Sequence, residues 1–444
     1  MARVVNLFFW LLLAAFILEF SLGISISTIP GLSLKNIAIY CLVITMLFVN
    51  PSMNKPLIEL NRLNVSIILF ILYCLASLIG TAILKVVPDY SLGQEIILFK
   101  SYMDPYVLFI ITYSILHDEK AIKRLLAAMV VVLTAFLAIT LLSSFDVWTV
   151  KRVTVDERWG RTRGAFAEAN QFAAYLAMFI PLVGAFILDA KSWILKMALT
   201  AVLIAAFYVM LMTGSRGGLV ALSVAIGPYY LLYTKQSLPK SLMGLVGIYG
   251  AGLLVLVLLY FILPEQTAHG LMLKLTGEFV DETNTDYSSG RLEIWELALS
   301  EFIRTPLWGT GWETFRPLFG LNSHSDYILF LVTTGVVGLY LFVRIYVGMM
   351  RQAMRWRRLD PTNIHYYNAY ISGLFAFMVS LAFVNIYNPY YFVLLYSALV
   401  LRLGAIAPKS RESSVGENEK APVPAGRLLR SRRATALSDQ QPVP

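Results

Sequence analysis

The chain has 444 residues, of which 58% are hydrophobic and only 14% are charged. Soluble domains carry about 25% charged residues, so this composition excludes an ordinary soluble protein and predicts an integral membrane protein. We expect no nucleic-acid partner despite the formal net charge of +9.

Neither a disulfide nor a metal site is expected. The two cysteines, Cys41 and Cys74, lie inside apolar runs and are interpreted as packing residues. The chain has no C-x-x-C, H-E-x-x-H or Asp-x-Asp spacing, so the sequence favours neither a bound catalytic metal nor another cofactor.

The sequence predicts an all-α polytopic membrane protein. A helix needs about 20 mostly apolar residues to cross the hydrocarbon core of a bilayer, and about twelve segments meet that requirement. The first is interpreted as a retained span and not as a signal peptide, because no small-residue cleavage site follows it. The spans are expected near 4–22, 34–50, 65–86, 100–116, 122–143, 170–189, 193–213, 216–234, 241–263, 326–349, 367–386 and 389–406.

The distribution of Lys and Arg predicts the orientation, because these residues concentrate in cytoplasmic loops. With the N-terminus inside, 23 of the 36 basic residues fall in cytoplasmic segments. Both termini are then cytoplasmic, and a transmembrane domain at 1–408 carries a long external loop at 264–325. The polar segment 409–444 is too poor in apolar residues to fold and is expected to be a disordered basic cytoplasmic tail.

Several arginines contradict this bias, since they fall on the external side. They are Arg161 and Arg163 within a basic cluster at 151–163, Arg216 in a tight turn between two spans, and Arg291 and Arg316 in the long loop. Positive charge placed against the usual bias suggests an anionic ligand at that face. The alternative is that these arginines reach lipid phosphates or pair with nearby acids such as Glu168.

The stretch 288–338 contains the most informative pattern. It begins as an amphipathic helix with one apolar face, which Pro306 is expected to end. A turn rich in Gly and aromatic residues follows at 308–312, and His324 then stands at the mouth of an apolar helix that starts near Tyr327. The expected apolar face consists of Leu292, Trp295, Leu299 and Phe302.

Three stretches, in this order, resemble the O-antigen ligase and polysaccharide polymerase superfamily. They are TRGAFAEANQFAAYLAMFIPL at 162–182, LMTGSRGGLVAL at 211–222, and PLWGTGWETF followed by HSDYILFLVTTGVVGL within 288–338. One departure is Ser325, where the family often has Asn after the histidine.

The resemblance implies metal-independent glycan transfer at the outer face of the bacterial cytoplasmic (inner) membrane, on a fold of the C-type glycosyltransferase kind. The donor would be an oligo- or polysaccharide on an undecaprenyl-pyrophosphate-type lipid, and the acceptor a glycan or lipid A-core. Membrane lipids are the other expected partners.

Arg216, Arg291 and His324 are the candidate catalytic residues. A guanidinium fork suits two phosphate oxygens, and Arg216 stands in a Gly-rich turn that permits close approach. His324 is either a base for the acceptor hydroxyl or, as imidazolium, a phosphate ligand. Candidate substrate-binding residues are Arg161, Arg163, Trp295 and Arg316.

Three functions remain open on the sequence. The first is a ligase that moves a finished glycan to an acceptor, and the second is a polymerase of repeat units. The third is a transporter or flippase of a lipid-linked glycan. Transporters carry charged or broken helices near mid-membrane. Here the charges gather on one face, which favours an enzyme.

Overall fold

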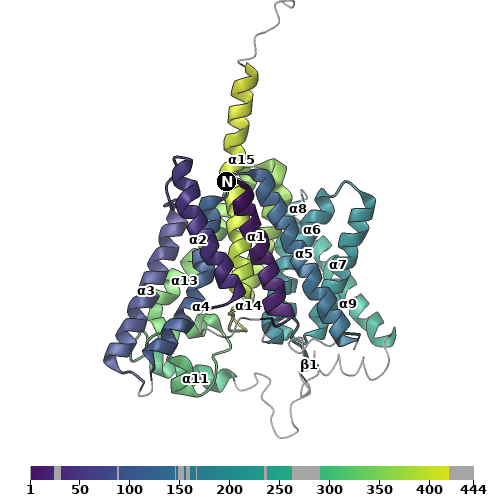
Figure 1. Cartoon of the computed structure of the whole chain (residues 1–444). Coiled ribbons are helices and arrows are strands. Elements are labelled where there is room, and N and C mark those ends of the chain that lie inside the picture. Colours follow the sequence, from purple (N-terminus) through teal and green to yellow (C-terminus); the bar gives the residue numbers. More distant parts are fainter. Residues whose placement is uncertain are drawn as a thin grey trace, which may run out of the picture.

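The computed structural model describes residues 2–24, 32–87, 90–145, 147–148, 155–156, 161–166, 168–234, 238–262 and 291–419. These residues are almost entirely helical (Figure 1). The elements before the long loop are α1 (Ala2–Phe16), η1 (Ile17–Ser21), α2 (Leu34–Ser52), α3 (Arg62–Leu84), α4 (Leu92–Ile115), α5 (Glu119–Ser144), β1 (Val155–Asp156), β2 (Arg161–Thr162), α6 (Ala169–Asp189), α7 (Trp193–Met212), α8 (Arg216–Tyr233) and α9 (Leu238–Ile262). Those after it are α11 (Arg291–Phe302), α12 (Phe315–Phe319), α13 (Asp326–Leu359), η2 (Pro361–Asn363), α14 (Ile364–Ser380) and α15 (Pro389–Glu419).

All twelve predicted spans overlap helices, although α14 ends at Ser380 and not at 386 as predicted, and the all-α membrane fold is confirmed. By length and hydropathy, nine helices in the described part of the chain are suited to cross a membrane. The other three predicted segments are α8, α9 and α14. The only strands among the described residues are β1 and β2, which pair antiparallel over two residues each.

The centre of the bundle is built from α6, α14 and α15. Of the nine candidate spans, α15 and α6 are the most enclosed, with 89% and 78% of their apolar windows buried, whereas α3 and α7 reach only 28% and 22%. The helix α14 packs against α6 and α8, and α15 packs against α4 and α5. The outer helices are therefore the ones that present apolar surface to lipid.

The two ends of the bundle differ in character. In Figure 1 the start of α1 and the end of α15 lie at one end, while β1 and α11 lie at the opposite end. The helix α15 continues to Glu419, through part of the segment expected to be disordered; residues 420–444 lie outside the described chain. The residues with candidate functions gather at the end that carries α11.

A break inside α13 was not predicted. Gly335 has φ 67° and ψ −172°, so two helical pieces meet there. The break frees the carbonyls of Val332 and Thr333, which accept hydrogen bonds from the amides of Thr310 and Gly311 at 2.8 Å each. In hydrocarbon an unsatisfied backbone group costs several kcal/mol, so the Gly-rich turn and the broken helix stabilise each other.

Glycines make this contact possible. A Cβ on Gly309 would lie 2.4 Å from the carbonyl carbon of Thr333, and one on Gly335 would lie 2.2 Å from the carbonyl oxygen of Leu307. Both residues have left-handed backbone, which favours glycine. The Gly-rich turn is therefore a docking segment whose backbone fills the gap in α13.

The segment after the glycines is fixed by Trp312. Its indole is buried in edge-on contact with Phe99 and Tyr102 of α4. Its backbone carbonyl accepts a hydrogen bond of 3.0 Å from the Tyr90 hydroxyl. Residues 306–312 are thus held between α13 and α4, which sets the starting point of the segment that leads to His324.

The predicted face of α11 is partly wrong. Leu292 and Leu299 are 64% and 38% exposed, whereas Ala298 is buried among residues of the α12–α13 region. A small side chain permits close approach between helices, so the packed face centres on Ala298 and not on the leucines. The helix also ends at Phe302, one turn before Pro306.

We expect Gly335→Ala to destabilise the protein, by about 1–3 kcal/mol from the left-handed backbone alone and further through the clash with Leu307. The thermal unfolding midpoint of the purified protein in detergent measures this. Gly80→Ala in α3 is the matched control, because its Cβ would meet nothing within 4 Å. Equal midpoints for the two variants would contradict the proposed role of the break.

Candidate functional site

The turn between α14 and α15, residues 381–388, joins the three motif segments. The backbone carbonyl of Asn385 accepts a hydrogen bond of 3.1 Å from Gln171 Nε2 of α6. A Cβ on Gly217 of α8 would lie 2.8 Å from the Cβ of Phe383. The Asn385 Oδ1 accepts a hydrogen bond of 2.7 Å from the backbone amide of His324. One turn therefore determines where all three segments lie.

The Asn385 carboxamide is itself held by a buried carboxylate. Its Nδ2 donates to Asp326 Oδ1 at 3.1 Å. The Asp326 carboxylate also accepts hydrogen bonds from the Tyr390 hydroxyl at 2.6 Å and from the Ile386 amide. A buried polar network that is this well satisfied is rigid, so the backbone at His324 has a fixed position.

His324 has a left-handed backbone with φ 51°, which is uncommon for a residue other than glycine. The next residue, Ser325, caps α13, because its Oγ accepts a hydrogen bond from the Ile328 amide. Asn and Ser are both good N-cap residues. Ser325 therefore still caps α13, although the family often has Asn at this position. The strained backbone of His324 persists only because surrounding contacts impose it.

The turn that carries Arg216 is shaped by its neighbours. Ser215 caps α8 by accepting a hydrogen bond of 3.1 Å from the Gly218 amide. A Cβ on Gly218 would lie 2.4 Å from the Cβ of Ala173 in α6, so glycine lets the start of α8 approach α6 closely. Arg216 is the first residue of α8, and its side chain is exposed.

Arg161 connects this turn to α6. Its Nε donates to the Thr213 carbonyl at 2.9 Å, and its Nη2 donates to Asn170 Oδ1 at 2.6 Å. Both contacts hold the protein's own structure together, so Arg161 has an evident positioning role beside the substrate-binding role that the sequence predicts. Arg163 follows directly after β2.

Electrostatic interactions connect Arg291 to the other charged groups. Burial lowers the pKa of Arg291, the positive charge of Arg216 lowers it further, and Glu168 opposes both effects. Burial raises the pKa of Glu168, against the effect of Arg161, Arg163 and Arg291. One acid therefore lies within electrostatic range of three arginines from two separate segments, 161–163 and α11.

Burial also lowers the pKa of His324, and the charge of Arg291 adds to this shift. The imidazole is therefore neutral at pH 7, which is the form that accepts a proton. These shifts place Arg291 within electrostatic range of both Arg216 and His324, at the end of the bundle that carries α11.

Trp295 connects α11 to the same place. Its indole N–H donates a hydrogen bond of 2.7 Å to the backbone carbonyl of Ser323, directly before His324. This contact positions the helix that begins with Arg291. The predicted role of Trp295 in binding substrate stays a prediction beside this observed structural role.

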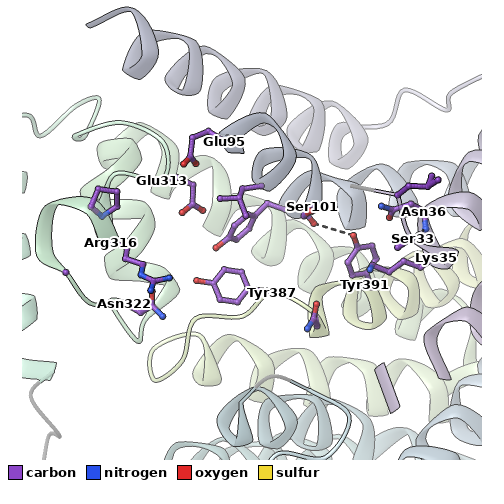
Figure 2. A pocket seen from close by; sticks show the side chains of 16 residues that line it. Ser33, Lys35, Asn36, Glu95, Ser101, Glu313, Arg316, Asn322, Tyr387 and Tyr391 are labelled. Carbon is purple, nitrogen blue, oxygen red and sulfur yellow. Dashed lines mark hydrogen bonds between the residues drawn. The ribbon is translucent and has the colours of Figure 1, made fainter. Parts of the chain in front are cut away.

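Arg316 lies apart from the other candidates, in the short helix α12. Its side chain lines a cavity of about 930 Å³ together with Glu313, Asn322 and Tyr387 (Figure 2). Arg304, another arginine of the long loop, is exposed and forms an ion pair of 2.8 Å with Glu301. The arginines of this loop thus occupy three different environments.

Sequence reasoning missed Asn385 and Asp326, which position His324. The available signals were an acidic residue at the first position of an apolar span and an asparagine within the apolar stretch 381–391. Among the residues that the structure describes, no group of three or more His, Cys, Asp or Glu side chains is arranged to hold a metal ion.

The fold and this site define an all-α membrane protein with arginines and a neutral histidine grouped at one end of its bundle. A family model described as O-antigen ligase matches residues 199–343, a range that includes Arg216, Arg291 and His324. The match confirms the resemblance to the O-antigen ligase superfamily, whose members are ligases or polymerases of the glycosyltransferase type. No curated protein matched the chain.

We expect Arg291→Gln to raise the pKa of His324, because it removes the positive charge that disfavours the imidazolium. The protein would be labelled with ¹³C-histidine and titrated by NMR, and the His324 resonance assigned by its loss in His324→Gln. Arg304→Gln is the control, since Arg304 is exposed and paired with Glu301. An unchanged His324 titration in Arg291→Gln would place Arg291 outside electrostatic range.

Proposed function

We propose that this protein is a ligase that transfers an oligo- or polysaccharide from a lipid pyrophosphate of the undecaprenyl type to an acceptor hydroxyl. The observation that carries the proposal is the group formed by Arg216, Arg291 and His324. The arginines bring positive charge to the end of the membrane bundle, and the histidine adds a proton acceptor.

The energetics of the arginines favour an anionic ligand. Arg216 and Arg291 repel each other, and burial adds a further penalty on the charged form of Arg291. An anion between them would relieve both costs, because opposite charge favours the ionised guanidinium. A pyrophosphate with an isoprenoid tail suits a site at the end of a membrane bundle.

The same charges would assist the chemistry. Pyrophosphate leaves as the bond from the anomeric carbon to its oxygen breaks, and negative charge develops on that oxygen. Fixed guanidinium groups stabilise such charge with little reorganisation, and their planar fork binds two oxygens at once. In this proposal they take the part that a metal ion plays in many glycosyltransferases.

His324 would act on the acceptor. Its neutral imidazole takes the proton of the acceptor hydroxyl as the oxygen attacks the anomeric carbon. The new glycosidic bond forms on the face opposite to the departing pyrophosphate, so the configuration inverts. The buried contacts of Asn385 and Asp326 hold the His324 backbone while this occurs.

We propose further that the site faces the outside of the bacterial cytoplasmic membrane, with both chain ends inside. The support is the excess of Lys and Arg in the loops at the opposite end of the bundle. Reporter fusions after Arg358 should be cytoplasmic, and fusions after Arg304 should be external. A cytoplasmic reporter after Arg304 would contradict the orientation.

Deletion of the gene should leave a finished polymer on its lipid carrier, unattached to acceptor, in a glycan profile of the cell. The wild-type gene and Arg304→Lys should restore attachment. Arg216→Lys and Arg291→Lys should not restore it at normal expression, because lysine keeps the charge but loses the bidentate fork. Single repeat units in the deletion strain would instead identify a polymerase. Full rescue by both lysine variants would remove the proposed phosphate contacts.

His324→Ala should lower the transfer rate by about 10²–10⁴-fold, the scale for a positioned general base. His324→Gln should be nearly as impaired, because an amide accepts a hydrogen bond but takes no proton at neutral pH. The assay uses purified protein, lipid-linked donor and excess chelator. Near wild-type turnover of His324→Gln would contradict the base role, and a requirement for added Mg²⁺ would contradict the role of the arginines.

A further inference from the structure

The proposed chemistry leaves unused a cavity beside Arg316. It has a volume of about 930 Å³. It lies between the start of α2, the first turns of α4, the segment 313–322 and the turn 387–391 (Figure 2). Its lining includes Lys35, Glu95, Glu313, Arg316, Tyr387 and Tyr391.

This cavity borders the segment that carries His324. Asn322, which lines it, is two residues before His324, and Tyr387 is two residues after Asn385. Figure 1 shows α2 and α4 on one side of the bundle and α6 and α8 on the other. The cavity therefore lies away from α8, which begins with Arg216, whereas α11, which begins with Arg291, lies on the same side of the bundle as α4.

The polar lining suits sugar hydroxyls. In Figure 2 the carboxylates of Glu95 and Glu313 lie near each other, and the Tyr387 ring lies across from Glu313, toward Arg316 and Asn322. Glu95 Oε2 is buried and has no hydrogen-bond partner among the described residues. A buried carboxylate oxygen without a partner is costly, and a sugar hydroxyl would satisfy it.

Glu313 has a strained backbone conformation. Its φ of 56° is left-handed, and it directly follows the anchored Trp312. Burial, together with the nearby charge of Glu95, raises the pKa of Glu313 to about 7. At neutral pH its carboxyl group is therefore present in both forms, and it can accept a hydrogen bond from a hydroxyl or donate one.

The tyrosines and Arg316 supply the other contacts that a sugar in this cavity would make. Tyrosine rings offer a flat apolar face with a polar tip, which matches a sugar ring with its C–H face and hydroxyl edge. The guanidinium of Arg316 forms no ion pair with an acidic side chain in the described ranges, so its donors are available to sugar oxygens. The volume lies within the usual range for small-molecule sites.

We propose that this cavity is the binding site for the acceptor saccharide, in which Glu313, Arg316 and Tyr387 hold the sugar so that its hydroxyl reaches His324. The inference rests on the proposed ligase function and deepens it. It gives the acceptor a place beside the base, from which its hydroxyl attacks the anomeric carbon on the face opposite to the departing pyrophosphate.

Photo-crosslinking in native cells tests the site with the saccharides that the cell itself supplies. Benzoylphenylalanine would replace Leu98, which lines the cavity, or Ile96, which is two residues away on α4 and does not line it. The two side chains are similarly exposed, at 45% and 49%, so they form a matched pair. The adducts are identified by mass spectrometry.

The expected result is a saccharide adduct without polyprenyl pyrophosphate at position 98 and none at position 96. Glu313→Gln and Arg316→Gln should reduce that adduct. In the purified assay, with the acceptor identified by the adduct, they should raise the KM for acceptor about tenfold or more. The KM for the lipid-linked donor should be unchanged.

A polyprenyl-linked adduct at position 98, no saccharide adduct there, or equal adducts at both positions would overturn the inference. So would a raised donor KM with an unchanged acceptor KM. Failure of the proposed function appears separately, as full rescue of attachment by Arg216→Lys and Arg291→Lys while the adduct at position 98 persists.

Discussion

The contact on which the rest of the site depends is the hydrogen bond from the His324 amide to Asn385 Oδ1. Asn385 is itself fixed by Asp326 through its side chain and by Gln171 through its backbone. Segments more than two hundred residues apart in the sequence are thereby joined at one turn. Asn385, Asp326 and Gln171 are buried, so packing sets the geometry of the bonds among them and holds the acceptor of the His324 amide in place.

The hydrocarbon environment imposes the second constraint. A helix that breaks within a membrane must have its freed carbonyls satisfied by protein. The segment 306–311 donates hydrogen bonds to the carbonyls freed by the break at Gly335. These bonds also fix the start of the segment that leads through Glu313 to His324. The structural need to fill a gap in α13 thus positions both the base and the wall of the cavity.

Charge then distinguishes two environments near His324. In the first, Arg216 of α8 lies close enough to Arg291 of α11 to lower the pKa of Arg291. In the second, two carboxylates and three tyrosines line a cavity with Arg316. An anionic leaving group suits the first environment and a neutral, hydroxyl-rich molecule suits the second. A displacement from a pyrophosphate needs both environments, because its leaving group is anionic and its acceptor is a neutral sugar.

The sequence by itself determined the class of protein and the locations of the twelve helices, because the cost of apolar and polar groups in lipid is local and can be read residue by residue. It also singled out Arg216, Arg291 and His324. Only the tertiary structure decided the break at Gly335, the packed face of α11, the contacts of Asn385 and the separation of Arg316 from the other arginines. These depend on partners distant in the sequence, and hydropathy and helical periodicity carry no information about such pairs.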